Sequence, residues 1–340
     1  MELIFEKKNK RTGDITSGIL RGYIADFDVS EEDISTFEVK MALPSARDDL
    51  LFIEGEVETV LFVEGTEYGG IIDGSTLDLE NKEVTYTGRT WRGTLGDYIV
   101  EPGKDVYRYV SGSGAAVMRS LPHHPLITFT GSGVTVPRTK LERWCTTHEA
   151  AKAIMAAAKS ACLEFRYEAN ANGRDGGQVI CEVRKKRDLR NDIAFSQDYG
   201  DRVAVKITRD GTTPRRLICL GPEGDDGRQT ALILYADKNW NVTKTPISGS
   251  YPQDTHEVSD DADLEEEGRK RFAELIEAHT SVEVTVSDID LMIGDIISAK
   301  DNLTGEEVSA SISGIVWKRE DYGGHAVETV EYRTSSGTII

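Results

Sequence analysis

The chain has 340 residues, roughly two to three times the length of a typical domain, so the sequence predicts several domains with a sizeable buried core. It carries 40 basic and 59 acidic residues, and a surface with the resulting net charge of −19 repels phosphate backbones and anionic lipid headgroups. Sequence-reading nucleic-acid binding is therefore disfavoured.

The N-terminal part of the chain consists of short segments with alternating apolar residues, separated by turn residues. Strands are expected at 20–28, 37–43, 56–64, 68–73 and 84–91. Strands of this length and spacing suit an antiparallel barrel or sandwich. The segment TLGDYIVEP ends this unit, and the Gly-rich and Pro-rich stretch that follows it is typical of irregular connections.

The central part of the chain differs from its neighbours in charge and in pattern. The second hundred residues carry 15 basic and 11 acidic groups, whereas the first hundred carry 10 and 21 and the remainder carries 15 and 27. A helix is expected from Thr146, because TTHE has the capping-box spacing and apolar residues then recur at helical intervals. A hairpin is expected between 165–168 and 178–184, so the region 101–196 is interpreted as an α/β insert.

The strand pattern returns in the C-terminal part. Strands are expected at 203–209, 216–220, 230–236, 282–286, 296–300, 308–318 and 326–334. A helix interrupts them at about 261–279, with acidic residues in its first turns and basic residues further on, which is the order that the helix dipole favours. This part is therefore expected to be a second β unit interrupted by a helix.

Two segments far apart in the sequence resemble each other. VLFVEGTEYGGIIDG at 60–74 leads to EVTYTGRTW, and IISAKDNLTGEEVSASISGIVW at 296–317 leads to ETVEYRTSS. Each contains a Gly-Ile-Ile or Gly-Ile-Val core, followed by a strand in which Tyr86 or Tyr332 lies two residues after a Val. Alternating β sequence also resembles itself by chance, so two interpretations stay open, chance similarity or two similar β units.

No group of residues has the spacing of a known catalytic centre. Ser113 and Ser132 each lie in a Gly-Ser-Gly triplet, which is shorter than the GxSxG turn of a nucleophilic serine, so a flexible loop is favoured. His123 and His124 point in opposite directions in an extended segment, so a loop or interface role is favoured over joint metal binding. The other histidines have no ligand or triad neighbours: His148, His256, His279 and His325.

Charged clusters also have structural interpretations. The acidic segments 28–33 and 259–263 lack the residue order of a calcium-binding loop, so a solvated turn and a helix N-terminus are favoured. The basic run RKKR at 184–187 is interpreted either as a solvated hairpin edge or as a contact with an acidic neighbouring subunit. No Walker A loop and no GxGxxG follows a strand, so nucleotide binding lacks support.

The cysteines and the N-terminus indicate the compartment of synthesis. The cysteines have neither CxxC spacing nor a histidine partner, so reduced thiols in a cytosol are expected: Cys145, Cys162, Cys181 and Cys219. The N-terminus has no apolar signal-peptide core, and no stretch of 18 apolar residues occurs. Neither secretion by a signal peptide nor a membrane span is expected.

Three stretches carry a resemblance to a known family. They are FSQDYG at 195–200 with the following RRLICLGPEGDDGRQTALILYAD, YTGRTWRGTLGDYIVEP at 86–102, and LMIGDIISAKDNLTGEEVSASISGIVW at 291–317. In these stretches the chain resembles phage tail hub and tail-associated proteins, a β-rich family that includes baseplate hubs and prophage tail proteins. The resemblance covers nearly the whole chain in order, and its motifs are strand patterns rather than catalytic signatures.

The resemblance implies a β-rich α+β fold: a tube-like β-barrel domain at 1–100, an α/β insert domain at 101–196, and a second barrel domain at 197–340 that the helix interrupts. It implies a homotrimer whose paired barrels stack on a hexameric tail tube. The expected function is a structural hub of a phage or prophage tail tip, which connects the tube to the host-facing tip and neighbouring tail or baseplate proteins. The hub would form part of the DNA exit channel, with the basic insert facing neighbouring proteins.

On this hypothesis the protein is not an enzyme, has no cofactor or metal, lets DNA pass without specific binding, and does not insert into a membrane. It is assembled in the bacterial host cytoplasm and located in the virion tail tip. Two alternatives are a tail-associated cell-wall hydrolase, which needs paired carboxylates or a metal-bound water, and a carbohydrate-binding receptor module. The latter needs grouped aromatic residues, and the tryptophans are scattered: Trp91, Trp144, Trp240 and Trp317.

Overall fold

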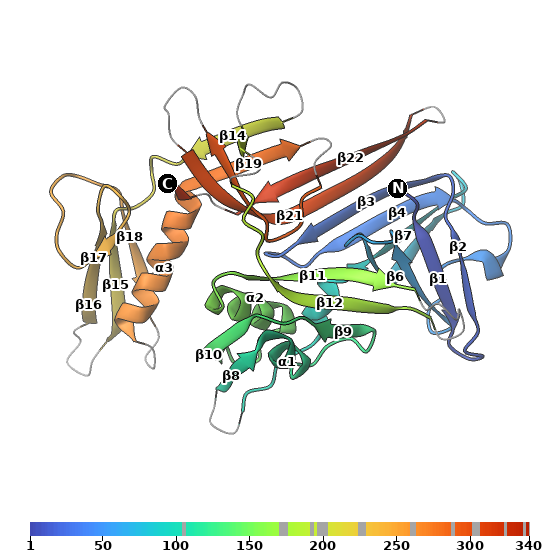
Figure 1. Ribbon diagram of the computed structural model, residues 1–340, viewed down its shortest axis with the longest axis horizontal. Coiled ribbons are helices and arrows are strands. Elements are labelled where there is room, and N and C mark those ends of the chain that lie inside the picture. Colours follow the sequence, from blue (N-terminus) through green and yellow to red (C-terminus); the bar gives the residue numbers. More distant parts are fainter. Residues whose placement is uncertain are drawn as a thin grey trace.

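The computed structural model describes most of the chain as a set of β-sheets with a few helices (Figure 1). The described residues are 1–103, 107–169, 176–190, 194–195, 203–223, 229–258, 263–286, 290–300, 307–322, 325–335 and 338–339. They form one sheet of 14 strands and three smaller sheets of two, three and four strands. In this part of the chain, no helix is both long enough and apolar enough to cross a membrane.

The large sheet combines strands from the two ends of the chain. Its N-terminal strands are β1 (Ile4–Asn9), β2 (Ile15–Ile19), β3 (Tyr23–Ser30), β4 (Thr36–Ala42), β5 (Val57–Phe62), β6 (Gly69–Asp78) and β7 (Glu83–Thr90). Its C-terminal strands are β13 (Ala194–Phe195), β14 (Val203–Arg209), β19 (Thr280–Val286), β20 (Ile296–Lys300), β21 (Glu307–Tyr322), β22 (His325–Thr334) and β23 (Thr338–Ile339). The strands expected in these two parts from the sequence are confirmed.

These strands contain the same five-stranded unit twice. The strand order is β3-β4-β7-β6-β5 in the first unit and β14-β19-β22-β21-β20 in the second. All neighbouring pairs in both units are antiparallel. Each strand of one unit therefore has a counterpart in the other, for example β14 for β3 and β21 for β6.

Two tyrosines have the same place in the two units. Tyr86 on β7 and Tyr332 on β22 are both buried. The hydroxyl of Tyr86 accepts a hydrogen bond of 3.1 Å from the amide of Leu51, and that of Tyr332 accepts one of 3.3 Å from the amide of Leu291. In each unit the tyrosine thus fixes a connecting loop over the core. The equivalence of these tyrosines, expected from the sequence, is confirmed, and it favours two similar units over chance similarity.

Strand register shows which other residues correspond. The pairing of β6 with β7 shifts just before Gly74, and the pairing of β21 with β22 shifts just before Gly314. Counted from the tyrosines, Gly74 corresponds to Gly314, and residues 70–72 correspond to 310–312. The Gly-Ile-Ile and Gly-Ile-Val triplets compared in the sequence are therefore not equivalent, because they lie four residues apart in register.

The two units join edge to edge within the chain. Residues 314–319 of β21 pair with residues 25–30 of β3, and we call this contact the internal junction. One apolar core runs across it, in which the ring of Trp317 lies 5.3 Å from that of Phe27 and 5.2 Å from that of Tyr68. Because β21 of the second unit pairs with β3 of the first unit, strand pairing among the described residues does not close either unit into a barrel of its own.

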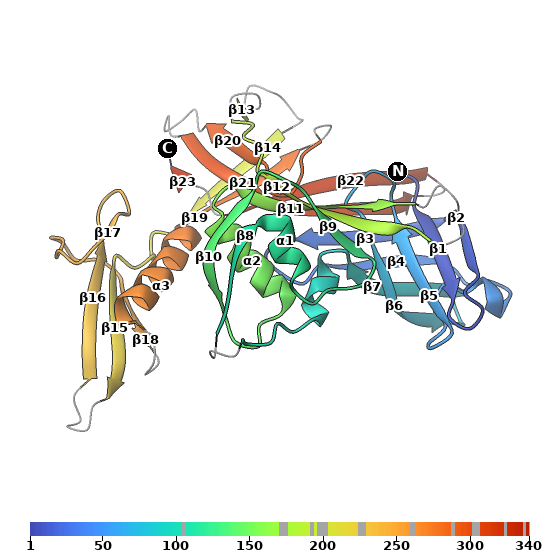
Figure 2. The same cartoon turned by 60° about the horizontal axis from the view of Figure 1, so that its bottom comes forward.

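The insert packs against the large sheet (Figures 1 and 2), and its apolar residues form a second core together with Val60, Phe62 and Ile71 of β5 and β6. Its elements are β8 (Arg108–Ser113), α1 (Gly114–Arg119), β9 (Ile127–Thr130), β10 (Thr135–Leu141), α2 (Thr147–Ala157), β11 (Ala161–Glu168) and β12 (Gln178–Lys185). The capping box at Thr146 is present, with the amide of Glu149 donating to the Thr146 hydroxyl at 3.1 Å. The expected hairpin is formed by β11 and β12. The short helix α1 lies in a segment that was expected to be irregular.

A small α/β unit lies between β14 and β19 in sequence and extends from one end of the large sheet (Figures 1 and 2). It contains β15 (Arg216–Glu223), β16 (Gln229–Ala236), β17 (Val242–Thr243), β18 (Gln253–Glu257) and α3 (Leu264–His279). Phe272 of α3 is fully buried against Leu217 and Leu234 of the sheet. The helix expected at 261–279 is therefore present, together with a sheet of its own, whereas the predicted domain boundaries stay predictions.

Candidate functional site

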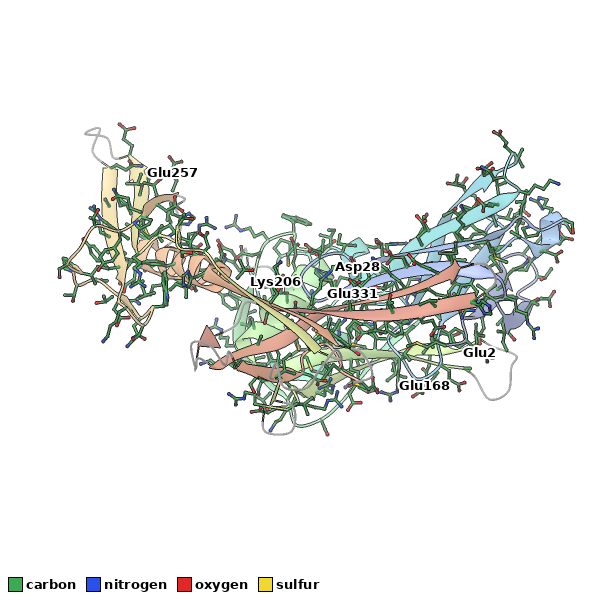
Figure 3. All side chains as sticks on the ribbon, turned by 90° about the horizontal axis from the view of Figure 1, so that it is seen from above. Glu2, Asp28, Glu168, Lys206, Glu257 and Glu331 are labelled. Carbon is green, nitrogen blue, oxygen red and sulfur yellow. The ribbon has the colours of Figure 1, made fainter. Side chains whose placement is uncertain are left out.

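Around β3 and β22 the large sheet has one apolar and one polar face, because successive side chains of a strand point to opposite sides. On β3, Phe27 is fully buried, whereas the side chains of Asp26 and Asp28 on either side of it are 52% and 39% exposed. Glu331 of β22 lies near Asp28 on this polar face (Figure 3), since both residues are paired in register with Val316. The polar face thus carries acidic residues from both units.

The carboxylates of the polar face are close enough to influence one another. Burial raises the pKa of Asp26, and the charges of Asp28 and Glu331 raise it further, whereas Lys318 opposes the shift. An open hollow of about 640 Å³ on this face is lined by four carboxylates and one guanidinium, those of Asp26, Asp28, Glu38, Asp73 and Arg89. Lys318 and Arg333 pair with Asp26 and Asp28 at 3.8 and 2.9 Å, but the carboxylates of this face outnumber its cations, and a net negative surface repels polyphosphates. Nowhere in the described part of the chain do three His, Cys, Asp or Glu residues group as metal ligands.

The internal junction defines a second feature, a pair of open strand edges. In β21 the residues of the junction are buried, with Ile315, Val316 and Trp317 5%, 3% and 0% exposed. The corresponding residues 75–77 of β6 are exposed, because β5 pairs with β6 only as far as Ile71. The counterpart of β3, β14, pairs with β19 along one side. Among the residues that the structure describes, the other side of β14 and the 74–78 edge of β6 have no strand partner.

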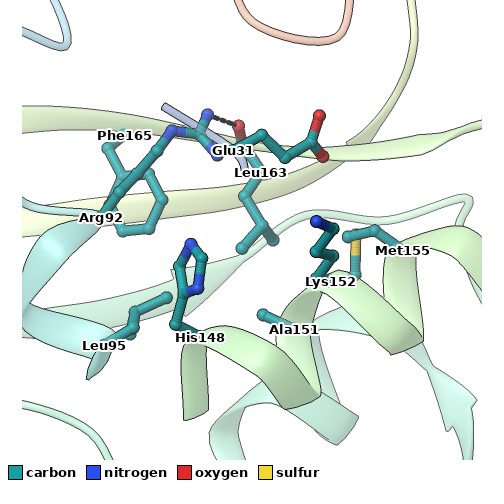
Figure 4. Close-up of a pocket in the computed structure, with 9 residues that line it drawn as sticks. All are labelled: Glu31, Arg92, Leu95, His148, Ala151, Lys152, Met155, Leu163 and Phe165. Carbon is teal, nitrogen blue, oxygen red and sulfur yellow. Dashed lines mark hydrogen bonds between the residues drawn. The ribbon is translucent and has the colours of Figure 1, made fainter. Parts of the chain in front are cut away.

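A small cavity of about 20 Å³ lies between the end of β7, α2 and β11 (Figure 4). Arg92 donates hydrogen bonds to Glu67 and to the carbonyl oxygen of Leu163, and its guanidinium lies 5.2 Å from the ring centre of Phe165. Burial raises the pKa of Glu67, and Arg92 opposes this shift. The space suits about one water molecule. The contacts of Arg92 attach the insert to the first unit, so we interpret this cavity as structural.

His148 also lines this cavity and yields a pH prediction. Burial lowers its pKa below the ordinary value of 6.5, and the charges of Arg92 and Lys152 lower it further. The unfolded chain therefore takes up a proton near pH 6.5 that the folded chain resists, so the free energy of unfolding falls as the pH drops below that value. The loss is about 1.4 kcal/mol for each unit between the two pKa values.

Urea unfolding at pH 7.5, 6.5 and 5.5 measures this effect. His148→Gln is expected to weaken the pH dependence, whereas His325→Gln, which removes an exposed histidine, is the matched control. An unchanged slope in His148→Gln contradicts the prediction.

Apart from the adjacent His123 and His124, the serines and histidines considered from the sequence lie on different elements of the fold. The ring nitrogen Nδ1 of His123 donates to a carbonyl oxygen two residues earlier at 2.6 Å, and Nδ1 of His124 accepts from an amide two residues later at 3.2 Å. These contacts agree with a loop role. Ser113 ends β8, and Ser132 is exposed in the turn between β9 and β10. The remaining histidines lie on β18, α3 and β22: His256, His279 and His325.

The acidic segments also have structural roles. The hydroxyl of Ser30 accepts hydrogen bonds of 3.1 and 3.2 Å from the amides two and three residues later, which makes this segment a turn. Asp263 accepts hydrogen bonds of 2.9 Å from the amides two and three residues later at the start of α3, as expected for a helix N-terminus. Residues 259–262 lie outside the described part of the chain.

The basic run at 184–187 binds its own chain. Arg187 Nε donates to Asp295 Oδ1 at 2.7 Å, and a second nitrogen of Arg187 donates to the other carboxylate oxygen. Arg184 pairs with Glu164 and also lies 3.7 Å from Asp295, whose side chain is fully buried. Arg184 is therefore not a solvated edge residue, whereas the side chain of Arg187 is paired but still 43% exposed. The contact of this run with a neighbouring subunit stays a prediction. The sequence contained no signal for Asp295, because its partners are more than a hundred residues away.

The four cysteines are free thiols and are buried. Burial raises the pKa of Cys162 to about 11, and it raises the pKa of Cys181 well above the ordinary value. Thiols in this state are protonated at neutral pH, so they behave as apolar core side chains rather than as nucleophiles.

Comparison with known proteins identifies the fold. No protein-family model and no curated protein matches the chain. Among solved structures, the chain is similar to a tail protein from Neisseria meningitidis MC58, with a TM-score of 0.52 and 15% identity over 98% of this chain and 97% of the other. It is similar to the 43 kDa tail protein of prophage MuSo2 from Shewanella oneidensis, with a TM-score of 0.58 and 14% identity over 98% of both chains.

A third similar structure is the prophage tail protein gp18 from Listeria monocytogenes EGD-e, with a TM-score of 0.56 and 10% identity over 99% of this chain and 95% of the other. All three are tail proteins, and the second and third are tail proteins of prophages. The chain has the fold of these tail proteins over almost its whole length, as the resemblance in its sequence predicted.

Proposed function

We propose that the chain is a structural, non-enzymatic component of a phage or prophage tail, and that it forms the hub of the tail tip. In this role several copies form a ring that connects the tail tube to the host-facing tip. The observation that supports this proposal is the repeated five-stranded unit, whose two copies join edge to edge within a chain that has the fold of tail proteins. Because each chain contains two such units, a homotrimer would present six units in a ring. Each unit could then contact one subunit of a hexameric tail tube.

The polar face of the large sheet is the proposed wall of the DNA exit channel. It carries Asp26, Asp28 and Glu331 from the two units, and such carboxylates repel a passing phosphate backbone instead of binding it. On this proposal, the protein functions by assembling with tube proteins and with tail-tip or baseplate proteins, and not by catalysis.

Size-exclusion chromatography with light scattering, followed by negative-stain imaging, tests the proposal. We expect a trimer that appears as a ring with a central hole, alone or after addition of the tube protein. A strict monomer at tens of micromolar that also fails to assemble with tube protein contradicts it. Antibody labelling of isolated particles provides a second test, with label expected at the tail tip.

A further inference from the structure

The two strand segments that pair in the internal junction, one in β21 and one in β3, each have a counterpart at an open edge of the large sheet. Equivalence of the tyrosines and of the strand registers matches residues 314–318 of β21 with 74–78 of β6. The same equivalence matches residues 25–28 of β3 with 205–208 of β14. In one chain, the segments in β21 and β3 are therefore paired with each other, whereas their counterparts in β6 and β14 have no strand partner among the described residues.

We propose that β14 of one copy pairs with residues 74–78 of β6 in a second copy, in the register of the internal junction. That register places Thr208 opposite Thr76 and Lys206 opposite Asp78. The inference rests on the proposed assembly of several copies, and it adds which two edges meet and how they are aligned.

Charge at the two edges supports this partner. Inside the chain, Lys318 of β21 lies 3.8 Å from Asp26 of β3, across the internal junction. The corresponding residues are Asp78 on β6 and Lys206 on β14, so the same opposite-charge pair recurs with its signs exchanged. Opposite charges at directly facing positions favour strand pairing, whereas like charges oppose it. A second copy of this chain therefore supplies an edge of complementary charge.

Exposed apolar side chains at the β6 edge also support pairing with a second copy. Leu77 is 47% exposed, although its counterpart Trp317 is completely buried in the internal junction. Leu79, directly after the strand, is 74% exposed. Strand edges that carry exposed apolar side chains tend to pair with another strand, and proteins usually cover them. Pairing with β14 of a second copy covers this edge.

The two edges lie apart within one chain, since β14 and β6 are well separated in both views of the large sheet (Figures 1 and 2). In the order of the sheet, β19, β22, β21, β3, β4 and β7 lie between β14 and β6. Neighbouring strands are ~4.8 Å apart, so seven strand spacings separate the edges by roughly 34 Å along the sheet. Pairing between copies is consequently head to tail, and such contacts produce a closed ring or a filament.

Cysteine crosslinking tests the register. In Thr76→Cys/Thr208→Cys, both new thiols replace exposed hydroxyls, and the native cysteines are buried. Directly opposed residues have the Cβ separation that a disulfide requires. After mild oxidation we expect a ladder of covalent oligomers on a non-reducing gel, absent from each single variant. Thr76→Cys/Asp210→Cys, which is out of register by two residues on the same face, is the matched control.

Charge reversal tests the pair itself. Lys206→Asp places two carboxylates opposite each other and is expected to weaken self-association by about fivefold to tenfold in dissociation constant. Asp78→Lys/Lys206→Asp is expected to restore most of the affinity. Lys238→Asp makes the same charge change at an exposed position of the small α/β unit and should have little effect.

The outcomes separate this inference from the proposed function. If the protein oligomerises but Thr76→Cys/Thr208→Cys does not crosslink, or if the out-of-register control crosslinks equally well, the proposed pairing is overturned and the tail role stays intact. A protein that stays monomeric, alone and with tube protein, overturns both. An equal effect of Lys206→Asp and Lys238→Asp rejects the charge pair.

Discussion

Replacement of Trp317 by alanine is expected to lower the free energy of unfolding by about 3–5 kcal/mol, the range for large aromatic residues in a packed core. Trp317 is completely buried, and its ring contacts Phe27 and Tyr68 of the first unit. Truncation thus leaves a cavity where the two five-stranded units join. Because the core is continuous across the internal junction, we expect both units to be destabilised together.

Urea unfolding followed by circular dichroism measures this change independently of tryptophan fluorescence. Trp144→Ala is the matched control, because Trp144 is 62% exposed and its loss should change stability by less than about 0.5 kcal/mol. Trp317→Phe should cost much less than Trp317→Ala, since the buried indole nitrogen of Trp317 has no hydrogen-bond partner to lose. A loss below about 1 kcal/mol in Trp317→Ala contradicts this account of the junction.

Replacement of Asp295 by asparagine is expected to cost about 3 kcal/mol, the lower end of the range for breaking a buried ion pair, because Asp295 is completely buried whereas Arg187 is 43% exposed. The carboxylate accepts from two nitrogens of Arg187 and from the amide of Met292 at 2.8 Å. Arg184, which is only 14% exposed, also lies beside it. The variant therefore removes the anion of Arg187 at the boundary between the insert and the second unit, whereas Arg184 keeps Glu164.

Asp188→Asn is the matched control for Asp295→Asn. Asp188 pairs with Arg190 at 2.6 Å, but both side chains are more than 40% exposed, and exposed ion pairs contribute little. Thermal unfolding of the two variants should differ clearly, with the larger decrease in Asp295→Asn. Equal decreases contradict the assignment of Asp295 as the buried anchor of the basic run.

The local elements of the fold were predictable from the sequence because their signals lie within a few residues. Alternation of apolar side chains located β3 to β7, β14 and β19 to β22 of the large sheet, whereas β1, β2, β13 and β23 were not expected. The hydroxyl and carboxylate of Thr146 and Glu149 located the start of α2. The equivalence of Tyr86 and Tyr332 was also predictable, since each follows a valine in a similar strand. The short helix α1 was missed because six residues carry too little helical periodicity.

Long-range pairing was not predictable in the same way. Residues 216–257 read as further strands of a β unit, whereas the structure packs them with α3 into a small sheet of their own. The arginines of the basic run looked solvated, because their carboxylate Asp295 is distant in the sequence. The candidate assembly edges were also invisible, since an open edge is defined by a partner that is missing beside it.

The sequence by itself determined the β-rich composition, most strands, the two longer helices, the acidic charge and the resemblance to tail proteins, because these depend on local pattern and residue counts. Only the tertiary structure decided that β21 pairs with β3, that Trp317 closes the resulting core, and that matching edges at β6 and β14 are left over. The physical reason is register. Alternating sequences can pair in many ways, and burial of side chains from distant segments selects one of them.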